Sequence, residues 1–449
     1  MPDESDALSS ETTTDRDRDP SFSVPPPADT EIQMHAVDRS LPFGALDPDA
    51  VKVVRRLSRF GHEAYLVGGC VRDILLGIAP KDFDVVTSAR PSEIRRLFRN
   101  SRLIGRRFRL AHILFKNRKV IEAATFRRTP TEGDDVSERH AAENLFGNAG
   151  DDAVRRDFTI NALMYDVQRK QIRDWVGGLN DIERGVIRTI GDPDRRLPED
   201  PVRIVRAVKF SARLGFEIDA SLRDACARHA PLVLECSKAR LVEEVLKLLR
   251  SGKAAPSLEM IAEIGVLTHL LPALDGLRRD EHGEGRSWAE LRRADELLGE
   301  GRALTDAVLL AALLYPAGGE CLEAGGDVAR ELEETLREAV RPLTFTRRQL
   351  SRVRQIYLAQ RRLARGPGTR RARKLLDREY APEAIDLMEI AAGDEEGAAL
   401  AGEWRRALRS RNGAAPQAAN RGAKRNDNSG RSGRRRRRRR PGSGKNEQA

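Results

Sequence analysis

The chain has 449 residues, of which 40% are hydrophobic and 33% charged, and its formal net charge is +11. This length favours two or three domains over one core, and no apolar run is long enough to span a membrane, so an integral membrane protein is excluded. The positive charge favours a polyanionic partner, usually nucleic acid, and the four cysteines without paired spacing favour a reducing, cytoplasmic setting.

Both ends of the chain differ from the middle in composition. Residues 1–45 hold ten acidic and three basic side chains together with "VPPP", which is typical of a disordered acidic segment. Residues 413–449 form a low-complexity tail whose last 29 residues carry twelve basic and two acidic side chains. The tail is predicted to bind RNA without sequence preference, and a merely solubilising role is the alternative.

Residues 46–127 predict a small mixed sheet with helices. Asp47 as N-cap, Pro48 in the first turn and Gly61 beyond the end predict a first helix. Further signals, in chain order, predict a strand over 64–67, a helix over 71–77, a strand over 82–87, a helix over 91–98 and a hairpin over 109–126.

From residue 128 onward the character of the sequence changes. Residues 128–150 lack any period and predict a mobile loop, and strand signals fade from about 151. Apolar residues at helical spacing then predict helices over 200–216, 221–250, 255–271, 288–315, 327–340, 346–365 and 370–411. The fold class is therefore α+β, a small mixed sheet domain followed by all-α domains.

Two aspartates, Asp82 and Asp84, stand in the short stretch "PKDFDVV". If both lie on one strand they face the same side, where like charges repel and desolvation is costly. Divalent cations such as Mg²⁺ relieve this repulsion, and two such ions can support an in-line phosphoryl transfer. A solvated strand start is the plainer alternative.

Twelve residues upstream, "LVGGCVRD" places Gly68 and Gly69 between a predicted strand and helix. Glycine lets backbone N–H groups approach a phosphate, and Arg72 in the first turn offers a forked donor to the same anion. A diglycine alone is only a turn, but with the aspartate pair it predicts a triphosphate site facing metal ions.

The stretch "RRDFTINAL" adds further polar candidates. Arg155 and Arg156 are potential phosphate donors, while Asp157 could bind metal, orient an arginine or cap the segment that contains Asn161. Glu122, on the predicted strand "VIEAATF", competes with Asp157 as a third carboxylate of the site.

A basic stripe is predicted on the helix that follows "PEDP". Its members recur every three or four residues: Arg203, Arg206, Lys209 and Arg213, the last of which is expected to be solvated. Asp200 accepts and Arg203 donates, and this pair matches the amino group and ring nitrogen that adenine and cytosine share.

Together, "LVGGCVRDILLG", "PKDFDV", "RRDFTINAL" and "EDPVRIVRAVKF" resemble the successive motifs of class II nucleotidyltransferases. This family comprises bacterial poly(A) polymerases and tRNA CCA-adding enzymes, within the DNA polymerase beta superfamily. The resemblance implies that Asp82 and Asp84 bind two Mg²⁺ ions and are catalytic with Asp157. It implies nucleotide-binding roles for Gly68, Gly69, Arg72, Arg155, Arg156, Asn161, Asp200, Arg203 and Arg206.

The resemblance also implies a domain plan: a catalytic domain over 46–190, a nucleobase-recognition domain over 191–255 and an RNA-binding domain over 256–412. Segments 103–115 and 370–388 and the arginine-rich tail resemble the poly(A) polymerase branch. The expected activity is therefore addition of AMP from ATP to RNA 3′ ends, with a partner in RNA degradation bound by the tail. The alternatives are a CCA-adding enzyme and an inactive RNA-binding adaptor.

Overall fold

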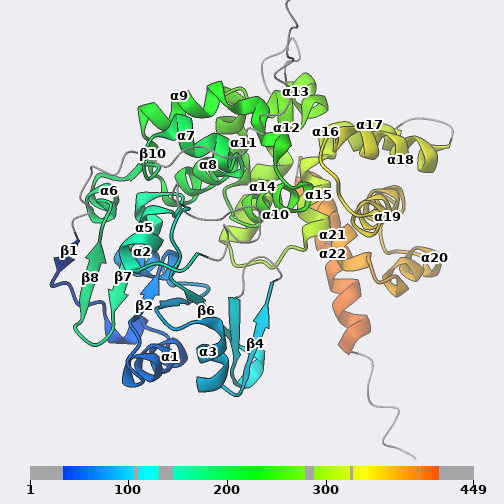
Figure 1. The fold of residues 1–449 in the computed structure, drawn as a ribbon. Helices are drawn as coiled ribbons and strands as arrows, with labels where there is room; N and C mark the ends of the chain where they lie inside the picture. Colours follow the sequence, from blue (N-terminus) through cyan, green and yellow to red (C-terminus); the bar gives the residue numbers. More distant parts are fainter. Residues whose placement is uncertain are drawn as a thin grey trace, which may run out of the picture.

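The computed structural model describes residues 34–105, 110–130, 145–278, 288–323, 327–393 and 395–413. A mixed sheet formed by the first half of the chain is followed by a large helical part (Figure 1), which confirms the predicted α+β class. Most of the predicted acidic segment, the centre of the predicted mobile loop and nearly all of the tail lie outside the described residues. Disorder there stays a prediction.

Eight strands form the main sheet in the order β1-β8-β7-β2-β3-β6-β5-β4. Their bounds are His35–Val37 (β1), Ala64–Val67 (β2), Asp84–Thr87 (β3), Ser101–Ile104 (β4), Leu110–Leu114 (β5), Val120–Thr125 (β6), Met164–Asp166 (β7) and Gln171–Asp174 (β8). Among these described strands, β3 and β6 form the one parallel pair. The predicted strands over 64–67 and the hairpin within 109–126 are confirmed, whereas β3 begins at Asp84 and leaves Asp82 in the preceding loop.

The expected end of the disordered segment at residue 45 is too late. Residues 35–37 form the edge strand β1, which pairs antiparallel with β8. Leu41 is buried, and its backbone N–H donates to the Tyr165 hydroxyl at 3.3 Å. Burial of Leu41 and pairing of β1 with β8 thus order the end of a segment that its acidic composition had predicted to be disordered.

Alternating side chains of the sheet enter two cores, as the period of a strand requires. Leu66 and Val85 pack on one face against α1, α2 and α3, while Tyr65 and Val67 pack on the other face against α5. Strands β7 and β8 were missed because each is only three or four residues long. Such short strands are specified by their neighbours in the sheet more than by their own sequence.

The helices of the sheet region are α1 (Pro48–Arg59), α2 (Gly69–Leu75), α3 (Pro91–Leu97), α5 (Ala149–Val154) and α6 (Gly178–Arg184). The predicted cap of α1 is confirmed, because Asp47 accepts hydrogen bonds from the backbone N–H groups of Asp49 and Ala50 at 2.9 and 3.0 Å. Such a cap stabilises a helix by about 1 kcal/mol. Short 3₁₀ turns are η1 (Phe43–Ala45), η2 (Lys116–Arg118) and η3 (Thr159–Asn161).

The helical part begins with α7 (Pro193–Glu199), α8 (Val202–Leu214), α9 (Ala220–Arg228), α10 (Lys238–Leu249), α11 (Ala254–Glu263), α12 (Leu267–Leu270) and α13 (Pro272–Arg278). It continues with α14 (Ala289–Gly299), α15 (Asp306–Leu313), α16 (Tyr315–Gly318), α17 (Glu320–Glu323), α18 (Val328–Ala339), α19 (Arg347–Leu363), α20 (Arg370–Arg373), α21 (Ala381–Ala391) and α22 (Glu395–Gly413). This part also contains two 3₁₀ turns, η4 (Ala230–Glu235) and η6 (Lys374–Asp377). A two-stranded parallel ladder pairs β9 (Val186–Ile187) with β10 (Glu217–Ile218).

Helical type was predicted correctly over this part, but several long helices are broken. The helix predicted over 255–271 ends at Glu263, just before Gly265, whose φ is +76°. The one predicted over 288–315 breaks near Gly301, whose φ is +83°. A positive φ terminates a helix and is readily adopted by glycine.

One continuous hydrophobic core runs through the helical part, and it includes residues of the sheet region. Phe158 and Ile160 are fully buried in this core, where the Phe158 ring meets the Phe210 ring of α8 edge to face at 5.8 Å. The two parts are therefore joined by packing as well as by the chain. None of the helices in the described ranges is long and apolar enough to span a membrane.

Candidate active site

The diglycine turn between β2 and α2 needs glycine at its first position. Gly68 has φ +75°, and its N–H donates to the Leu163 carbonyl at 3.1 Å. A Cβ atom on Gly68 would lie 3.4 Å from Nη1 of Arg156, and one on Gly69 would lie 3.6 Å from Nη2 of Arg72. The surface left bare by the two glycines is thus approached by two guanidinium groups, which suits an anion.

Arg72 is itself part of the buried framework beneath that turn. Its guanidinium donates to Asp73 at 2.9 and 2.6 Å and to the side-chain oxygen of Asn161, and it stacks on the Phe210 ring at 5.0 Å. Only 2% of the residue is exposed. The structure thus shows Arg72 and Asn161 bonded to each other under the turn, and direct phosphate binding by Arg72 stays a prediction.

The acidic pair lies at the start of β3. Asp82 and Asp84 are both exposed, and within the described part of the chain neither forms a hydrogen bond or ion pair with a basic side chain. Asp84 pairs in register with Glu122 of the parallel strand β6, a spacing of about 4.8 Å between backbones. Three carboxylates therefore approach one another at this edge.

The electrostatics of Asp84 reflect this crowding. Although Asp84 keeps an exposed surface, the protein packed around it displaces part of the water at its carboxyl, and this raises the pKa of Asp84 to about 6. The charges of Glu122 and Asp82 add to the increase, while Arg156 opposes it. Glu122 in turn lies 3.2 Å from Nε2 of His112. The negative charge at this edge is therefore only partly neutralised by the protein.

These residues fit a site for Mg²⁺. Exposed carboxylate oxygens without a basic partner are the ligands this ion prefers, usually one or two from the protein with the remainder from phosphates and water. Among the described residues, no group of three or more Asp, Glu, His or Cys side chains is already gathered tightly enough to hold a metal ion. Phosphate oxygens of a substrate would have to complete the shell.

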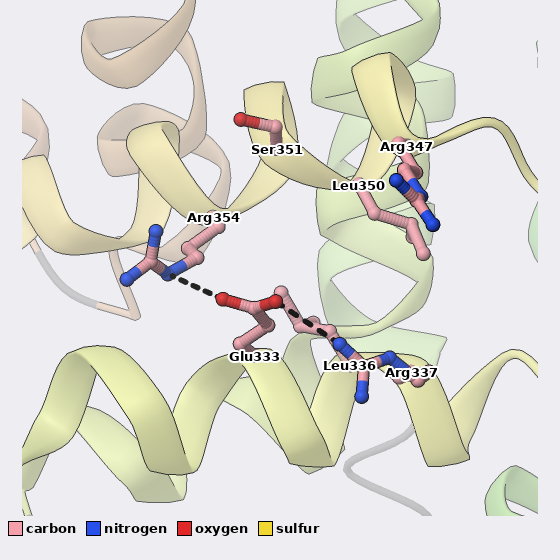
Figure 2. Close-up of a pocket in the computed structure, with 7 residues that line it drawn as sticks. All are labelled: Glu333, Leu336, Arg337, Arg347, Leu350, Ser351 and Arg354. Carbon is pink, nitrogen blue, oxygen red and sulfur yellow. Dashed lines mark hydrogen bonds and ion pairs between the residues drawn. The ribbon is translucent and has the colours of Figure 1, made fainter.

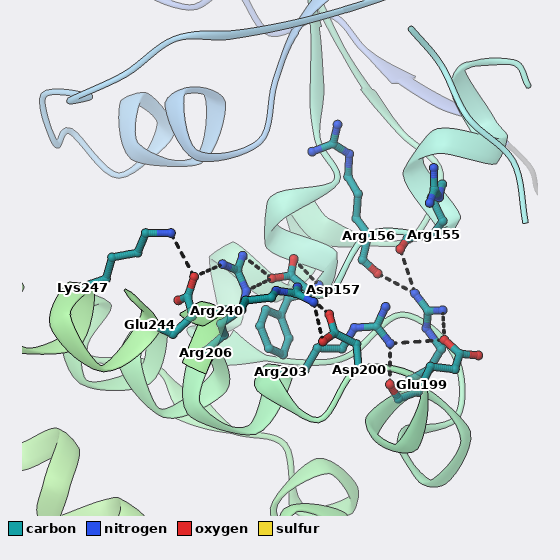
Figure 3. A network of polar contacts seen from close by, with 12 residues as sticks. Arg155, Arg156, Asp157, Glu199, Asp200, Arg203, Arg206, Arg240, Glu244 and Lys247 are labelled. Carbon is teal, nitrogen blue, oxygen red and sulfur yellow. Dashed lines mark hydrogen bonds and ion pairs between the residues drawn. The ribbon is translucent and has the colours of Figure 1, made fainter. Parts of the chain in front are cut away.

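Arg155 and Arg156 follow α5 and point away from the helical part (Figure 3). Asp152 accepts from Arg156 at 2.9 and 3.2 Å and so fixes its guanidinium near the diglycine turn. Burial lowers the pKa of Arg155, as do the neighbouring charges of Arg127 and Arg196, although Asp152 counteracts this. An anion placed between these arginines would gain from both.

Asp157 is engaged by an arginine of the helical part. Its Oδ2 accepts from Arg206 at 2.6 and 2.8 Å, and its Oδ1 accepts from the Asn161 amide at 3.1 Å (Figure 3 shows the arginine contact). Burial would raise the pKa of Asp157, but the Arg206 charge and these hydrogen bonds more than reverse it, so the pKa is lowered. Of the two candidates for a third carboxylate, Glu122 lies beside Asp84 and Asp157 orients an arginine.

Glu244 of α10 anchors the same network from the other side. It accepts from Lys209 at 2.6 Å, from Lys247 at 3.0 Å and from Arg206 at 3.3 Å. Burial would raise the Glu244 pKa, but Lys209 and Arg206 lower it to about 2. Burial also lowers the pKa of Lys209 to about 8.

The predicted base-reading residues lie at the junction of α7 and α8, but other residues occupy their polar groups. The Asp200 carboxylate accepts two hydrogen bonds from Arg240 at 2.8 and 2.7 Å, and the N-cap of α8 is the next residue, Pro201. Arg203 donates to the Arg196 carbonyl and to Glu199, the latter at 3.3 Å. Reading of a base by Asp200 and Arg203 stays a prediction that requires these contacts to be exchanged.

The basic stripe of α8 does lie on one face, but it packs against acids instead of facing solvent. Arg213, predicted to be solvated, donates to Asp73 at 2.8 Å, so that expectation was wrong. The acids that bind these and the neighbouring basic side chains, Asp73, Asp152 and Glu244, were missed because they look like ordinary helix residues. Their one sequence signal is an acidic residue within an otherwise apolar helix face.

A separate cavity of about 570 Å³ lies between α18 and α19 and holds none of the predicted site residues (Figure 2). Glu333 occupies its centre, 3.0 Å from Arg337 and 3.8 Å from Arg354. This carboxylate neutralises part of the arginine charge there. The cavity therefore adds nothing to the acidic pair and the diglycine turn.

Comparison with protein families gives three matches along the chain. Residues 64–188 match the model described as "Poly A polymerase head domain". Residues 215–277 match "Probable RNA and SrmB-binding site of polymerase A", and residues 327–441 match "Polymerase A arginine-rich C-terminus".

Individual relatives follow the same pattern. Poly(A) polymerase I of Salmonella typhi is 38% identical over 393 residues, 82% of each chain. A CCA-adding enzyme of Geobacillus kaustophilus is also 38% identical, but over 222 residues, 49% of this chain and 54% of its own. The crystal structure of the Bacillus stearothermophilus CCA-adding enzyme in complex with CTP superposes with a TM-score of 0.61 at 26% identity, covering 81% of this chain and 83% of that one.

Proposed function

The chain belongs to the poly(A) polymerase family and is a nucleotidyltransferase, and from this premise we propose that it adds AMP from ATP to RNA 3′ ends at the site around Asp82 and Asp84. The observation that carries this assignment is the pair of exposed carboxylates, without a basic partner in the described chain, beside Glu122 in register. A protein that only bound RNA would have no use for such a repulsive group.

Asp82, Asp84 and Glu122 would hold Mg²⁺, which when bound neutralises phosphate charge and assists attack at phosphorus. The diglycine turn gives the triphosphate a surface without side chains, and Arg156 donates to it. Arg72, Asn161 and Asp157 hold that turn and Arg206 in place. Asp157 is thus proposed as a positioning residue, and Glu122 as the third carboxylate.

In the reaction, the RNA 3′ oxygen attacks the α-phosphorus in line. A new P–O bond forms, the bond to the β-phosphate breaks, pyrophosphate leaves and the hydroxyl proton passes to solvent. The protein contributes mainly by positioning the two substrates and neutralising charge. Base selection is assigned to Asp200 and Arg203, with Arg240 moving off Asp200 when the base arrives.

The decisive experiment measures incorporation of each nucleoside triphosphate in turn into generic RNA and into tRNA lacking its CCA end. We expect Mg²⁺-dependent addition of AMP alone, with Asp82→Ala and Asp84→Ala inactive. Asp224→Ala, an exposed acid on α9, is the control and should remain active. Substantial activity of either site variant would refute the site, and CTP incorporation would favour the CCA-adding alternative.

The remaining assignments depend on composition. The arginine-rich tail is proposed to add salt-sensitive RNA affinity and to contact an RNA-degradation partner. A cytoplasmic location is proposed from the four cysteines, all of which are free.

A further inference from the structure

A groove of about 670 Å³ lies where the sheet region meets the helical part. One wall is Lys81 from the loop before β3, and the other comes from the turn between α10 and α11 and from α14. The full lining is Lys81, Arg250, Ser251, Gly252, Lys253, Pro256, Arg292, Asp295, Glu296, Leu298 and Gly299. No role has been assigned to it above.

Lys81 links the groove to the loop that carries the acidic pair. Lys81 immediately precedes Asp82, and both are exposed in the same loop. A chain that lies along the groove and passes Lys81 would thus approach the loop that holds Asp82.

The two acids that line the groove are already engaged by protein groups. Asp295 accepts from the backbone N–H groups of Ala254 and Ala255, both at 2.9 Å, and so caps α11. Glu296 accepts from Arg293 at 2.8 Å. Glu296 is therefore paired with a positive charge, whereas Asp295 keeps its negative charge and interacts with Lys253.

The four basic residues divide into two kinds. Arg250 is held by Asp306, and Arg292 by Glu259. Lys81 and Lys253 are exposed, and neither has an ion pair in the part of the chain that the structure describes. Positive charge without an ion pair thus lies on both walls, one lysine from each part of the protein, and Asp295 offsets part of the charge of Lys253.

We infer that this groove holds the sugar-phosphate backbone of the RNA segment that ends at the acidic pair, with Lys81 and Lys253 each binding phosphate. The inference rests on the proposed function and names the path of its RNA. Opposed lysines along an open groove suit a repeating anion and read no base, which fits an enzyme that adds to many sequences.

The test uses the full chain and a fluorescent hexa-adenylate with a 3′-deoxy end, which is too short to bridge to distant sites. We expect Lys81→Ala/Lys253→Ala to weaken binding at low salt about tenfold and to reduce the slope of log affinity against log salt by roughly 1.4. Arg55→Ala/Arg59→Ala, which removes two exposed charges from α1, is the matched control and should bind like the parent. Lys253→Arg, which keeps the charge, should also retain affinity.

Equal affinity of the lysine variant and the control would overturn the inference. So would binding of a hexaglutamate as tight as that of hexa-adenylate and equally lysine-dependent, because the groove would then be a site for an acidic protein segment. The same protein preparations are assayed for AMP incorporation from ATP into hexa-adenylate that has an ordinary 3′ hydroxyl. If the parent incorporates AMP but the lysine substitutions do not change binding, the proposed function is supported and the groove inference is wrong. If binding depends on the lysines but the parent incorporates no AMP, the groove inference is supported and the proposed function is wrong.

Discussion

Asp84 is held in an unfavourable state by its surroundings, since loss of water and the nearby Glu122 raise its pKa to about 6. Its ordinary value is 3.8, so between these two pH values the folded state binds a proton that the unfolded chain releases. The folded state therefore loses stability as the pH rises through this window. Under the proposed function, the site would keep this destabilising charge because the ionised form is the one that would bind metal.

We expect Asp84→Asn, which imitates the protonated form, to raise the melting temperature of the metal-free protein at pH 7.5. The gain in melting temperature should shrink toward pH 4, because Asp84 of the folded parent is then protonated and uncharged, like the asparagine that replaces it. Thermal melts in a chelator at both pH values measure this, with Asp224→Asn as the control. A melting temperature at pH 7.5 equal to or below that of the parent would contradict the expectation.

At this scale the sequence indicated candidate residues, whose roles stay predictions, but it did not indicate their partners. Gly68 was predictable because a diglycine between a strand and a helix implies an unusual backbone. The bidentate contact from Arg240 to Asp200 was not, because Arg240 lies 40 residues further along and nothing local marks it. Side-chain pairs between distant segments depend on packing that a single sequence does not display.

At the scale of elements, α8 and α10 hold the polar network in place. Lys209 and Glu244 have side chains that are only 9% and 5% exposed, and they lie 2.6 Å apart. The same carboxylate also reaches Arg206, which orients Asp157. Two helices thus set the position of a group on the sheet region.

Glu244→Gln should lower the free energy of unfolding by about 3 kcal/mol, because the buried Lys209 would lose its counter-charge. Chemical denaturation at neutral pH measures the loss. The control is Glu334→Gln on α18, whose pair with Arg330 is exposed and contributes little. A loss as small as that of the control would show that Lys209 finds another partner or gives up its proton.

The elements themselves were largely predictable. Strong signals such as the Asp47 cap and the alternating hairpin of β5 and β6 gave the correct elements. Strands β7 and β8 were missed, and their residues acquire strand character through pairing with each other and with β2 and β1. Long helices were joined wrongly where an internal glycine adopts a positive φ.

At the scale of the molecule, the proposed RNA affinity would be divided between a folded groove and a tail of net charge +10, from twelve basic and two acidic side chains. Deleting residues 413–449 should weaken binding of long RNA at low salt more than it lowers the rate at saturating RNA. Binding titrations at two salt concentrations, with a parallel rate measurement, test this. Equal affinity with and without the tail would count against its role.

The domain plan implied by the sequence placed the end of the catalytic domain at residue 190. Phe158, Ile160 and Ile187 come before that junction in the chain but are buried among the helices after it. The two portions therefore share one hydrophobic core, and we expect that they cannot be exchanged between related enzymes as independent domains. A chimera joined near residue 190 would need complementary side chains at Phe158 and Phe210; otherwise a cavity would form between the two portions.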